Sequence, residues 1–231
     1  MRAWPNGAGG RSSLGTVKEA LAFRLRRPNW DDLLTEDLPF GEDAESRFRD
    51  LVGNSQSYLE FGSGASTLFA AQNVGEVTTV ESDPRFLDAV VRRAQSLVSS
   101  SRLDHLNFLN GNIGGTGPWG KPIWPSIARP HRWSRYPLAP WDAMGADLRP
   151  DVVLVDGRFR VACALALITR QPEGQWTLLV DDYSERPEYG PIAEFAQLEG
   201  LHGRMAEFHP KKDAGTDSAA KALAHFLSDW R

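Results

Sequence analysis

The chain has 231 residues and a formal net charge of −4, and 41% of its residues are apolar. This length fits one α/β domain with a buried core. A negative net charge gives no general attraction for nucleic acid or an anionic membrane, so we expect neither partner. The N-terminus lacks the apolar segment of a secretion signal and no run is long enough to cross a membrane, which predicts a cytoplasmic protein.

Helical and strand patterns alternate along the chain, which predicts a doubly wound, mostly parallel α/β sheet. Residues 1–13 form a predicted flexible tail, and residues 14–231 a single domain. The first half predicts helices at 15–26, 43–52, 65–72 and 84–98, and strands at 57–61, 77–81 and 105–109. The second half predicts strands at 151–155 and 176–180 and helices at 159–169 and 187–199. Two strand-like segments, 203–208 and 222–227, predict a terminal hairpin, although the second also has helical propensity.

A glycine loop follows the first strand and a carboxylate ends the second. Residues 58–67 read Tyr-Leu-Glu-Phe-Gly-Ser-Gly-Ala-Ser-Thr, and Glu81 lies 17 residues beyond Gly64. Glycines let a ligand approach the backbone, a helix start offers free N–H groups, and a carboxylate in this position can bind a ribose diol. The pattern predicts a nucleoside site at the carboxyl ends of the strands. Thr67 stands where the dinucleotide fingerprint has its third glycine.

This segment resembles motif I of class I S-adenosylmethionine-dependent methyltransferases, and the resemblance covers residues from about 43 to 231. It implies a Rossmann-like, seven-stranded sheet that ends in an antiparallel hairpin, with S-adenosylmethionine as cofactor. Glu60 is then expected near the methionine end of the cofactor. Gly62, Ser63 and Gly64 are expected beneath it, and Glu81 on the ribose hydroxyls.

Carboxylates also follow the strands predicted at 151–155 and 176–180, namely Asp156 and the pair Asp181 and Asp182. Three carboxylates in one cleft need a cation or a proton to compensate them, and oxygen ligands suit Mg²⁺ or Ca²⁺. The pattern resembles metal-dependent O-methyltransferases of sugars and catechols, which implies that these aspartates hold a metal. The alternative is that Asp181 or Asp182 caps a turn or helix and that Asp156 forms an ion pair with Arg158 or Arg160.

Residues 111–150 predict a long irregular insertion that acts as a lid over the acceptor. They contain four of the eight tryptophans and seven of the fifteen prolines. Aromatic rings beside cationic donors suit sugar or aromatic acceptors, although the rings can equally pack the insertion on the sheet. The candidate acceptor-binding residues are Trp119, Trp133, Tyr136 and Arg158. Asn112 is a candidate for contact with the adenine, and His131 is a candidate general base beside Asp156.

We therefore predict a methyltransferase that methylates an oxygen of a small or carbohydrate-like acceptor. Methyl transfer from sulfonium to oxygen requires alignment of the reactants and removal or stabilisation of the acceptor proton. An NAD-dependent oxidoreductase built on the same half-site is the alternative enzyme, and a methyltransferase-like scaffold without turnover is the alternative binding protein. The sequence predicts neither the acceptor nor the oligomeric state.

Overall fold

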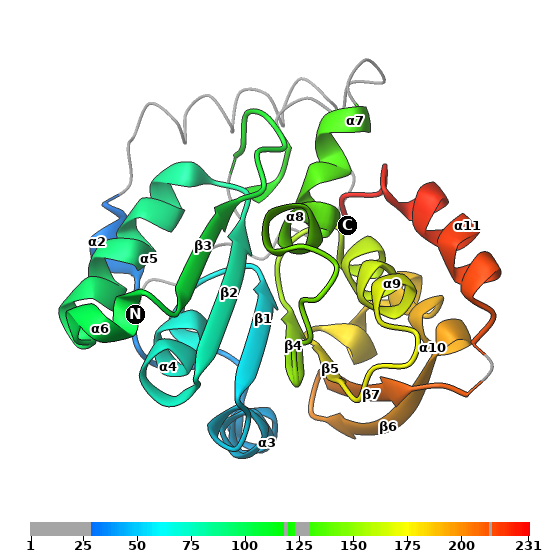
Figure 1. Cartoon of the computed structure of the whole chain (residues 1–231), viewed down its shortest axis with the longest axis horizontal. Coiled ribbons are helices and arrows are strands. Elements are labelled where there is room, and N and C mark those ends of the chain that lie inside the picture. The colour runs from blue at the N-terminus through cyan, green and yellow to red at the C-terminus, as the bar shows by residue number, and fades with distance from the viewer. Residues whose placement is uncertain (1–28, 118–119, 123–129, 213) are drawn as a thin grey trace.

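The computed structural model describes residues 29–117, 120–122, 130–212 and 214–231. The predicted tail at 1–13 and the predicted helix at 15–26 lie outside these ranges. Within them, the strands are β1 (Ser57–Phe61), β2 (Glu76–Glu81), β3 (Leu106–Asn110), β4 (Val152–Val155), β5 (Thr177–Val180), β6 (Ala196–His202) and β7 (Met205–Pro210). They form one seven-stranded sheet in the order β3-β2-β1-β4-β5-β7-β6, with β3 and β6 at its edges (Figure 1).

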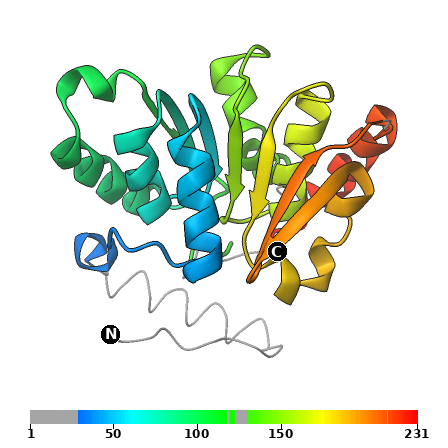
Figure 2. The same cartoon turned by 90° about the horizontal axis from the view of Figure 1, so that it is seen from below.

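Helices connect the strands and cover both faces of the sheet. In the described part of the chain the α-helices are α2 (Trp30–Leu33), α3 (Glu42–Gly53), α4 (Ala65–Asn73), α5 (Pro84–Leu97), α6 (Ser100–Leu103), α7 (Pro130–Trp133), α8 (Arg135–Met144), α9 (Arg160–Arg170), α10 (Ile192–Phe195) and α11 (Thr216–Phe226). Two short 3-10 helices, η2 (Tyr183–Glu185) and η3 (Pro187–Tyr189), follow β5. Seen from below, the blue α3 and the red α11 lie on opposite sides of the sheet (Figure 2).

The first five strands are parallel, and the last two are antiparallel to their neighbours. β1 pairs in parallel with β2 and with β4, β2 with β3, and β4 with β5. β7 runs antiparallel to both β5 and β6. The carboxyl ends of the parallel strands therefore share one edge, and the loops after these strands meet there. This arrangement confirms the predicted doubly wound, mostly parallel sheet with an antiparallel hairpin.

Alternating side chains of the strands enter two separate cores, as the two-residue period of a strand requires. On β1, Leu59 and Phe61 face the core under α8, α9 and α11, whereas Tyr58 faces the core under α3, α4 and α5. The whole of β4 is buried. Both faces of the central strands are thus shielded from solvent, which explains their continuous apolar sequences.

The end of the chain corrects two predicted elements. The hairpin is β6 and β7, so the helix predicted at 187–199 is replaced by short helical turns and by β6. The strand predicted at 222–227 lies in and just after α11, where an alanine-rich sequence favours a helix. α11 packs on α9, and beyond it the carbonyl oxygens of Trp230 and Arg231 accept hydrogen bonds from the N–H groups of Phe159 and Arg160, at 3.3 and 3.2 Å.

The insertion at 111–150 is only partly irregular. Residues 130–144 form α7 and α8, and α8 contacts β2, β3 and α9 as a crossover helix between β3 and β4. Residues 118–119 and 123–129, with Trp119, lie outside the described ranges. No helix in the described part of the chain has the length and apolar character needed to span a membrane.

Candidate functional site

The glycine loop joins β1 to α4 at the carboxyl edge of the sheet. Gly62 and Gly64 have φ angles of 109° and 157°, which residues with a side chain rarely adopt. A Cβ on Gly62 would lie 2.9 Å from the backbone nitrogen of Gly157, so this glycine permits two loops to approach. A Cβ on Gly64 would meet nothing within 4 Å, so the open side of the loop lies at Gly64.

Glu60 is buried beneath this loop and is bonded to the helix that follows. Its carboxyl oxygens accept hydrogen bonds from the hydroxyls of Ser66, at 2.5 Å, and Thr67, at 2.7 Å. Burial raises the pKa of this carboxyl to about 8, although both hydrogen bonds act against the shift. The bonds give Glu60 a structural role in the loop, and its contact with a cofactor stays a prediction.

Glu81, at the end of β2, lies beside the open side of the loop. Its Oε1 accepts hydrogen bonds from the N–H groups of Ser82 and Asp83, at 2.5 and 2.8 Å, and from the Ser82 hydroxyl at 3.0 Å. Among the described residues, only the hydroxyl of Ser63 donates a hydrogen bond to its Oε2, at 3.2 Å. One oxygen is therefore fixed by the protein, and the other retains capacity for a ligand hydroxyl.

The loops after β4 and β5 bring the three predicted aspartates together around two arginines. Nη2 of Arg160 lies 3.0 Å from Oδ1 of Asp156 and 3.3 Å from Oδ2 of Asp182. Arg204, in the turn between β6 and β7, binds both oxygens of Asp181 and lies 3.1 Å from Oδ1 of Asp182. The structure thus shows the ion pair between Asp156 and Arg160 that the sequence left as an alternative.

This donor set does not fit the Mg²⁺ or Ca²⁺ expected at Asp156, Asp181 and Asp182. Arginines already occupy the carboxylate oxygens that a hard cation would need, and they supply the compensating positive charge. Across the described ranges, no three or more His, Cys, Asp or Glu side chains are arranged to hold a metal ion. Arg204 could not be predicted from the sequence, because it lies 22 residues beyond Asp182 and reaches the cluster only through the fold.

Asp156 combines an accessible carboxyl with a shifted pKa. Its side chain is 29% exposed. Desolvation raises its pKa to about 7, the charges of Asp181 and Asp182 add to the shift, and Arg160 opposes it. A carboxyl group with this pKa can accept a proton near neutral pH.

Backbone strain is concentrated next to these carboxylates. Phe159 and Asp182 have φ angles of 56° and 59°, and they are the only non-glycine residues with positive φ in the described ranges. They lie in the loops after β4 and β5, respectively. Left-handed backbone in residues with side chains is costly and is characteristic of functional sites.

The predicted lid residues fall in different environments. Trp133 and Tyr136 are buried in the core under α8 and α9, and Tyr136 fits against Gly111 and Gly157, where a Cβ would overlap its ring or hydroxyl. His131 is exposed on α7, and Asn112 is exposed just after β3. Because Trp133 and Tyr136 are buried, their packing in this core is enough to explain why aromatic residues stand there. Roles for His131 and Asn112 stay predictions.

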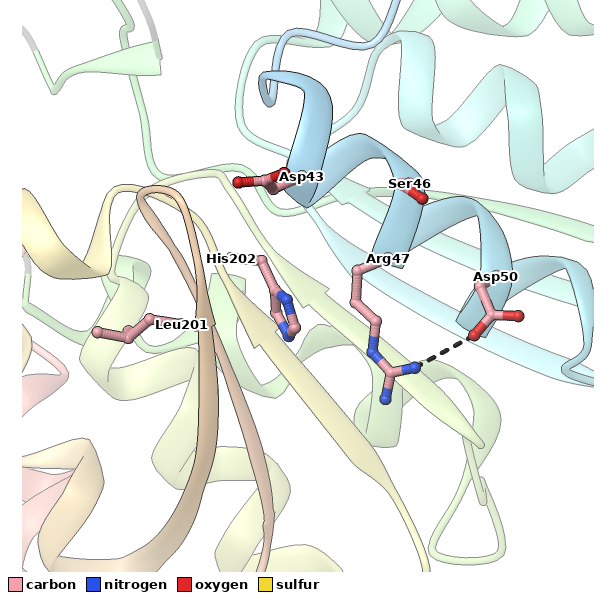
Figure 3. A pocket seen from close by; sticks show the side chains of 6 residues that line it. All are labelled: Asp43, Ser46, Arg47, Asp50, Leu201 and His202. Carbon is pink, nitrogen blue, oxygen red and sulfur yellow. Dashed lines mark hydrogen bonds and ion pairs between the residues drawn. The ribbon is translucent and has the colours of Figure 1, made fainter.

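A groove of about 560 Å³ lies elsewhere, between α3 and the end of β6. Its lining includes Arg47 and Asp50, which form an ion pair, and His202, which lies opposite α3 (Figure 3). None of the predicted cofactor or acceptor residues in the described ranges lines it. The candidate site is therefore the carboxyl edge of the sheet, formed by the glycine loop, Glu81 and the loop after β4.

Solved structures similar to this chain include a methyltransferase-like protein and several methyltransferases. A methyltransferase-like protein from Silicibacter pomeroyi is 32% identical, with a TM-score of 0.70, and the match covers 84% of this chain and 97% of that one. An RNA methyltransferase from Salinibacter ruber, solved with S-adenosylhomocysteine, is 14% identical over 76% of this chain and 95% of its own, with a TM-score of 0.42. The N-methyltransferase NodS from Bradyrhizobium japonicum, also solved with S-adenosylhomocysteine, is 13% identical over 86% of this chain and 98% of its own, with a TM-score of 0.39. No family model matches the chain, and no curated protein does.

Proposed function

Because this chain belongs to the family of methyltransferase-like proteins with the class I fold, we propose that it binds S-adenosylmethionine and methylates an oxygen of a small acceptor. The observation that carries the proposal is the hydrogen bond of 3.2 Å between Ser63 and Glu81. It joins the glycine loop to the acid at the end of β2, so the two halves of a nucleoside site face the same space.

The residues present fit the cofactor. Glu81 offers Oε2 to the ribose hydroxyls, because its other oxygen is held by backbone N–H groups. The open face of Gly64 lets a ligand lie against the backbone without meeting a Cβ. When bound, S-adenosylmethionine would supply an electrophilic methyl group on its sulfonium, with S-adenosylhomocysteine as the leaving group.

Asp156 is the general base in this proposal. It follows β4 at the same edge, it is partly exposed, and its raised pKa makes it a better proton acceptor than an ordinary carboxylate. Asp156 removes the proton from the acceptor hydroxyl as the new bond to the methyl group forms. Arg160 orients the carboxyl through its contact with Oδ1.

Calorimetry with S-adenosylhomocysteine tests the cofactor site. Loss of hydrogen bonds to a charged carboxylate costs roughly 1.5–3 kcal/mol, which corresponds to about a 10- to 100-fold loss of affinity. We expect this loss in Glu81→Gln. Glu76→Gln is the matched control, because Glu76 is exposed at the opposite end of the same strand, where it contacts His105.

Two results would contradict the proposal. The first is equal binding of S-adenosylhomocysteine by Glu81→Gln and the wild type. The second is preference of the wild type for NAD over S-adenosylhomocysteine, which would support the oxidoreductase. A protein that binds S-adenosylmethionine but yields no methylated product from any hydroxyl acceptor in a broad panel would instead support the scaffold without turnover.

A further inference from the structure

Arg158 stands out among the arginines at the carboxyl edge because it forms no ion pair with a carboxylate of the described residues, although the charge of Asp156 acts on it. It lies in the loop between β4 and α9, and its Nε is buried without a hydrogen-bond partner. Arg160 and Arg204, by contrast, are held by the aspartates. Within the described part of the chain, the Arg158 side chain makes no hydrogen bond and no ion pair. Burial, together with the charge of Arg160, lowers the pKa of its guanidinium.

The position of Arg158 is next to the proposed reaction site. It follows Asp156 by two residues, and the intervening Gly157 lies against Gly62 of the glycine loop. A Cβ added to Gly120 would lie 3.7 Å from Cγ of Arg158, so the stem of this side chain passes beneath the turn at Gly120. The guanidinium thus belongs to the region where an acceptor must lie to reach Asp156.

A desolvated cation without a hydrogen-bonding anion is unfavourable, and a protein gains stability by replacing it with an apolar side chain. Its presence in this site is explained if a ligand supplies the anion. The sequence that contains the nearby Gly120 has a similar charge bias, because residues 111–141 include no Asp or Glu, although the whole protein has a net charge of −4. That segment includes Lys121, Arg132 and Arg135.

We propose that Arg158 binds an oxyanion, a carboxylate or a phosphate, that the small acceptor carries beside its methylated oxygen. This inference rests on the proposed methyl transfer and narrows its acceptor to an acidic molecule. A guanidinium binds carboxylate and phosphate through two parallel hydrogen bonds, which also orients the ligand. A single guanidinium with a buried Nε recognises one oxyanion, whereas nucleic acid backbones are bound by many cations along a surface.

Titration of inorganic phosphate and of acetate into the protein saturated with S-adenosylhomocysteine tests the proposal. We expect at least one of the two anions to bind the wild type, with at least tenfold weaker binding to Arg158→Met. Arg158→Lys keeps the charge and loses the planar fork, so its affinity should lie between the two. Arg92→Met is the control, because Arg92 forms an exposed ion pair with Asp31 on the surface. Equal anion binding by Arg158→Met, or none by the wild type, overturns the proposal.

The carboxylate of the cofactor itself is the competing source of the anion, and a second ligand separates the two. 5′-Methylthioadenosine has the nucleoside and the sulfur of S-adenosylhomocysteine and lacks its amino acid. If the acceptor supplies the anion, Arg158→Met binds both ligands as tightly as the wild type does. If Arg158→Met weakens only S-adenosylhomocysteine, the anion belongs to the cofactor and the proposal is overturned. If the wild type does not bind S-adenosylhomocysteine, the proposed function itself is overturned.

Thermal melting completes the experiment. Because Arg158→Met removes a largely desolvated charge that forms no ion pair within the described residues, the variant should melt at or above the temperature of the wild type. A melting temperature far below that of the wild type would show that Arg158 stabilises the fold, and would overturn the proposal. Binding of a single-stranded oligonucleotide that Arg158→Met abolishes would also overturn it, in favour of a nucleic acid acceptor.

Discussion

Glu60 and Ser66 share a hydrogen bond of 2.5 Å that connects the end of β1 to the first turn of α4. Thr67 completes the connection, since its hydroxyl donates to Glu60 at 2.7 Å and accepts the N–H of Gly64 at 3.1 Å. The glycine loop is therefore held from inside by one buried acid and two hydroxyls. Its shape is set before any ligand binds, which lowers the entropy cost of binding.

The buried acid makes stability depend on pH. Because the folded pKa of Glu60, about 8, exceeds its ordinary value of 4.5, the folded protein retains a proton that the unfolded chain releases. The contribution of Glu60 to the free energy of unfolding is therefore greatest below pH 4.5. Between pH 4.5 and pH 8 it falls by up to about 1.4 kcal/mol per pH unit. In urea unfolding, the free energy of unfolding should decrease less from pH 5.5 to pH 8 for Glu60→Gln than for the wild type.

Asp156 contributes a similar slope through its own raised pKa, so the comparison with Glu60→Gln isolates one group. Glu76→Gln, which changes an exposed acid, should follow the wild type at both pH values. Parallel curves for Glu60→Gln and the wild type would mean that Glu60 is ionised in the folded protein.

Removal of Arg160 should destabilise the protein. Its side chain is 4% exposed and contacts Asp156 and Asp182, so Arg160→Met leaves two carboxylates without their common partner. Loss of one partner from a buried ion pair typically lowers the free energy of unfolding by about 3–5 kcal/mol. Because both aspartates are partly exposed, we expect a loss of about 3 kcal/mol for Arg160→Met. Arg92→Met, at an exposed pair, should cost less than about 1 kcal/mol in the same unfolding measurement. Equal losses in the two variants would contradict a central role for Arg160.

Asp156 should titrate near neutral pH. Carbon-13 NMR of protein labelled at the aspartate carboxyl carbons should show one resonance that moves with a midpoint near pH 7 and is absent from Asp156→Asn. Once an acceptor is known, kcat/KM should rise with pH through this midpoint, since a base acts only after it loses its proton. A resonance that titrates near pH 4 would remove Asp156 as the base and leave the exposed His131 as the candidate.

Tyr136 and Gly157 should be coupled in stability. A Cβ on Gly157 would overlap the hydroxyl of Tyr136 and lie 2.9 Å from the nitrogen of Gly62, so Gly157→Ala should cost about 1–3 kcal/mol. Tyr136→Phe removes the hydroxyl and should recover part of this loss in the double variant. Gly53→Ala is the control, because open space surrounds Gly53 at the end of α3. Additive losses in the double variant would contradict direct contact.

Divalent cations should leave the aspartate cluster unaffected. Arg160 and Arg204 already compensate Asp156, Asp181 and Asp182, so millimolar Mg²⁺ or Ca²⁺ should not raise the melting temperature of the wild type above its value in EDTA. A clear increase that Asp182→Asn abolishes would show that a cation displaces the arginines, and would restore the metal site.

The first five strands and the glycine loop could be predicted because local sequence determines them. Continuous apolar runs mark strands covered on both faces, and paired glycines followed by a helix mark the loop. β6 could not be predicted in this way, since Gln197, Leu198 and Glu199 are all exposed on an edge strand and show no alternation. Its pairing with β7 is also irregular between Leu198 and Gly200.

The chemistry of the site was predicted less well than its position. The sequence located the aspartates at the carboxyl edge and did not reveal what compensates them. Arg160 lies four residues beyond Asp156, and it was one of the two ion-pair partners that the sequence suggested for this aspartate. Arg204 contacts Asp181 only because the β6–β7 turn folds back over the end of β5. No local sequence pattern predicts a contact between residues so far apart in the chain. The same limit applies to Tyr136, whose aromatic ring resembled a ligand-binding group until its packing was known.

The carbonyl groups of Trp230 and Arg231 accept hydrogen bonds from the N–H groups of Phe159 and Arg160. The loop that carries Asp156 and Arg158 therefore cannot open at its helical end unless these last residues detach. Hydrogen exchange at Phe159 and Arg160 reports on that release, because their amides become accessible to solvent only in the detached state. The last two residues, each 71 positions beyond its partner in the chain, thus hold the acceptor side of the site in place.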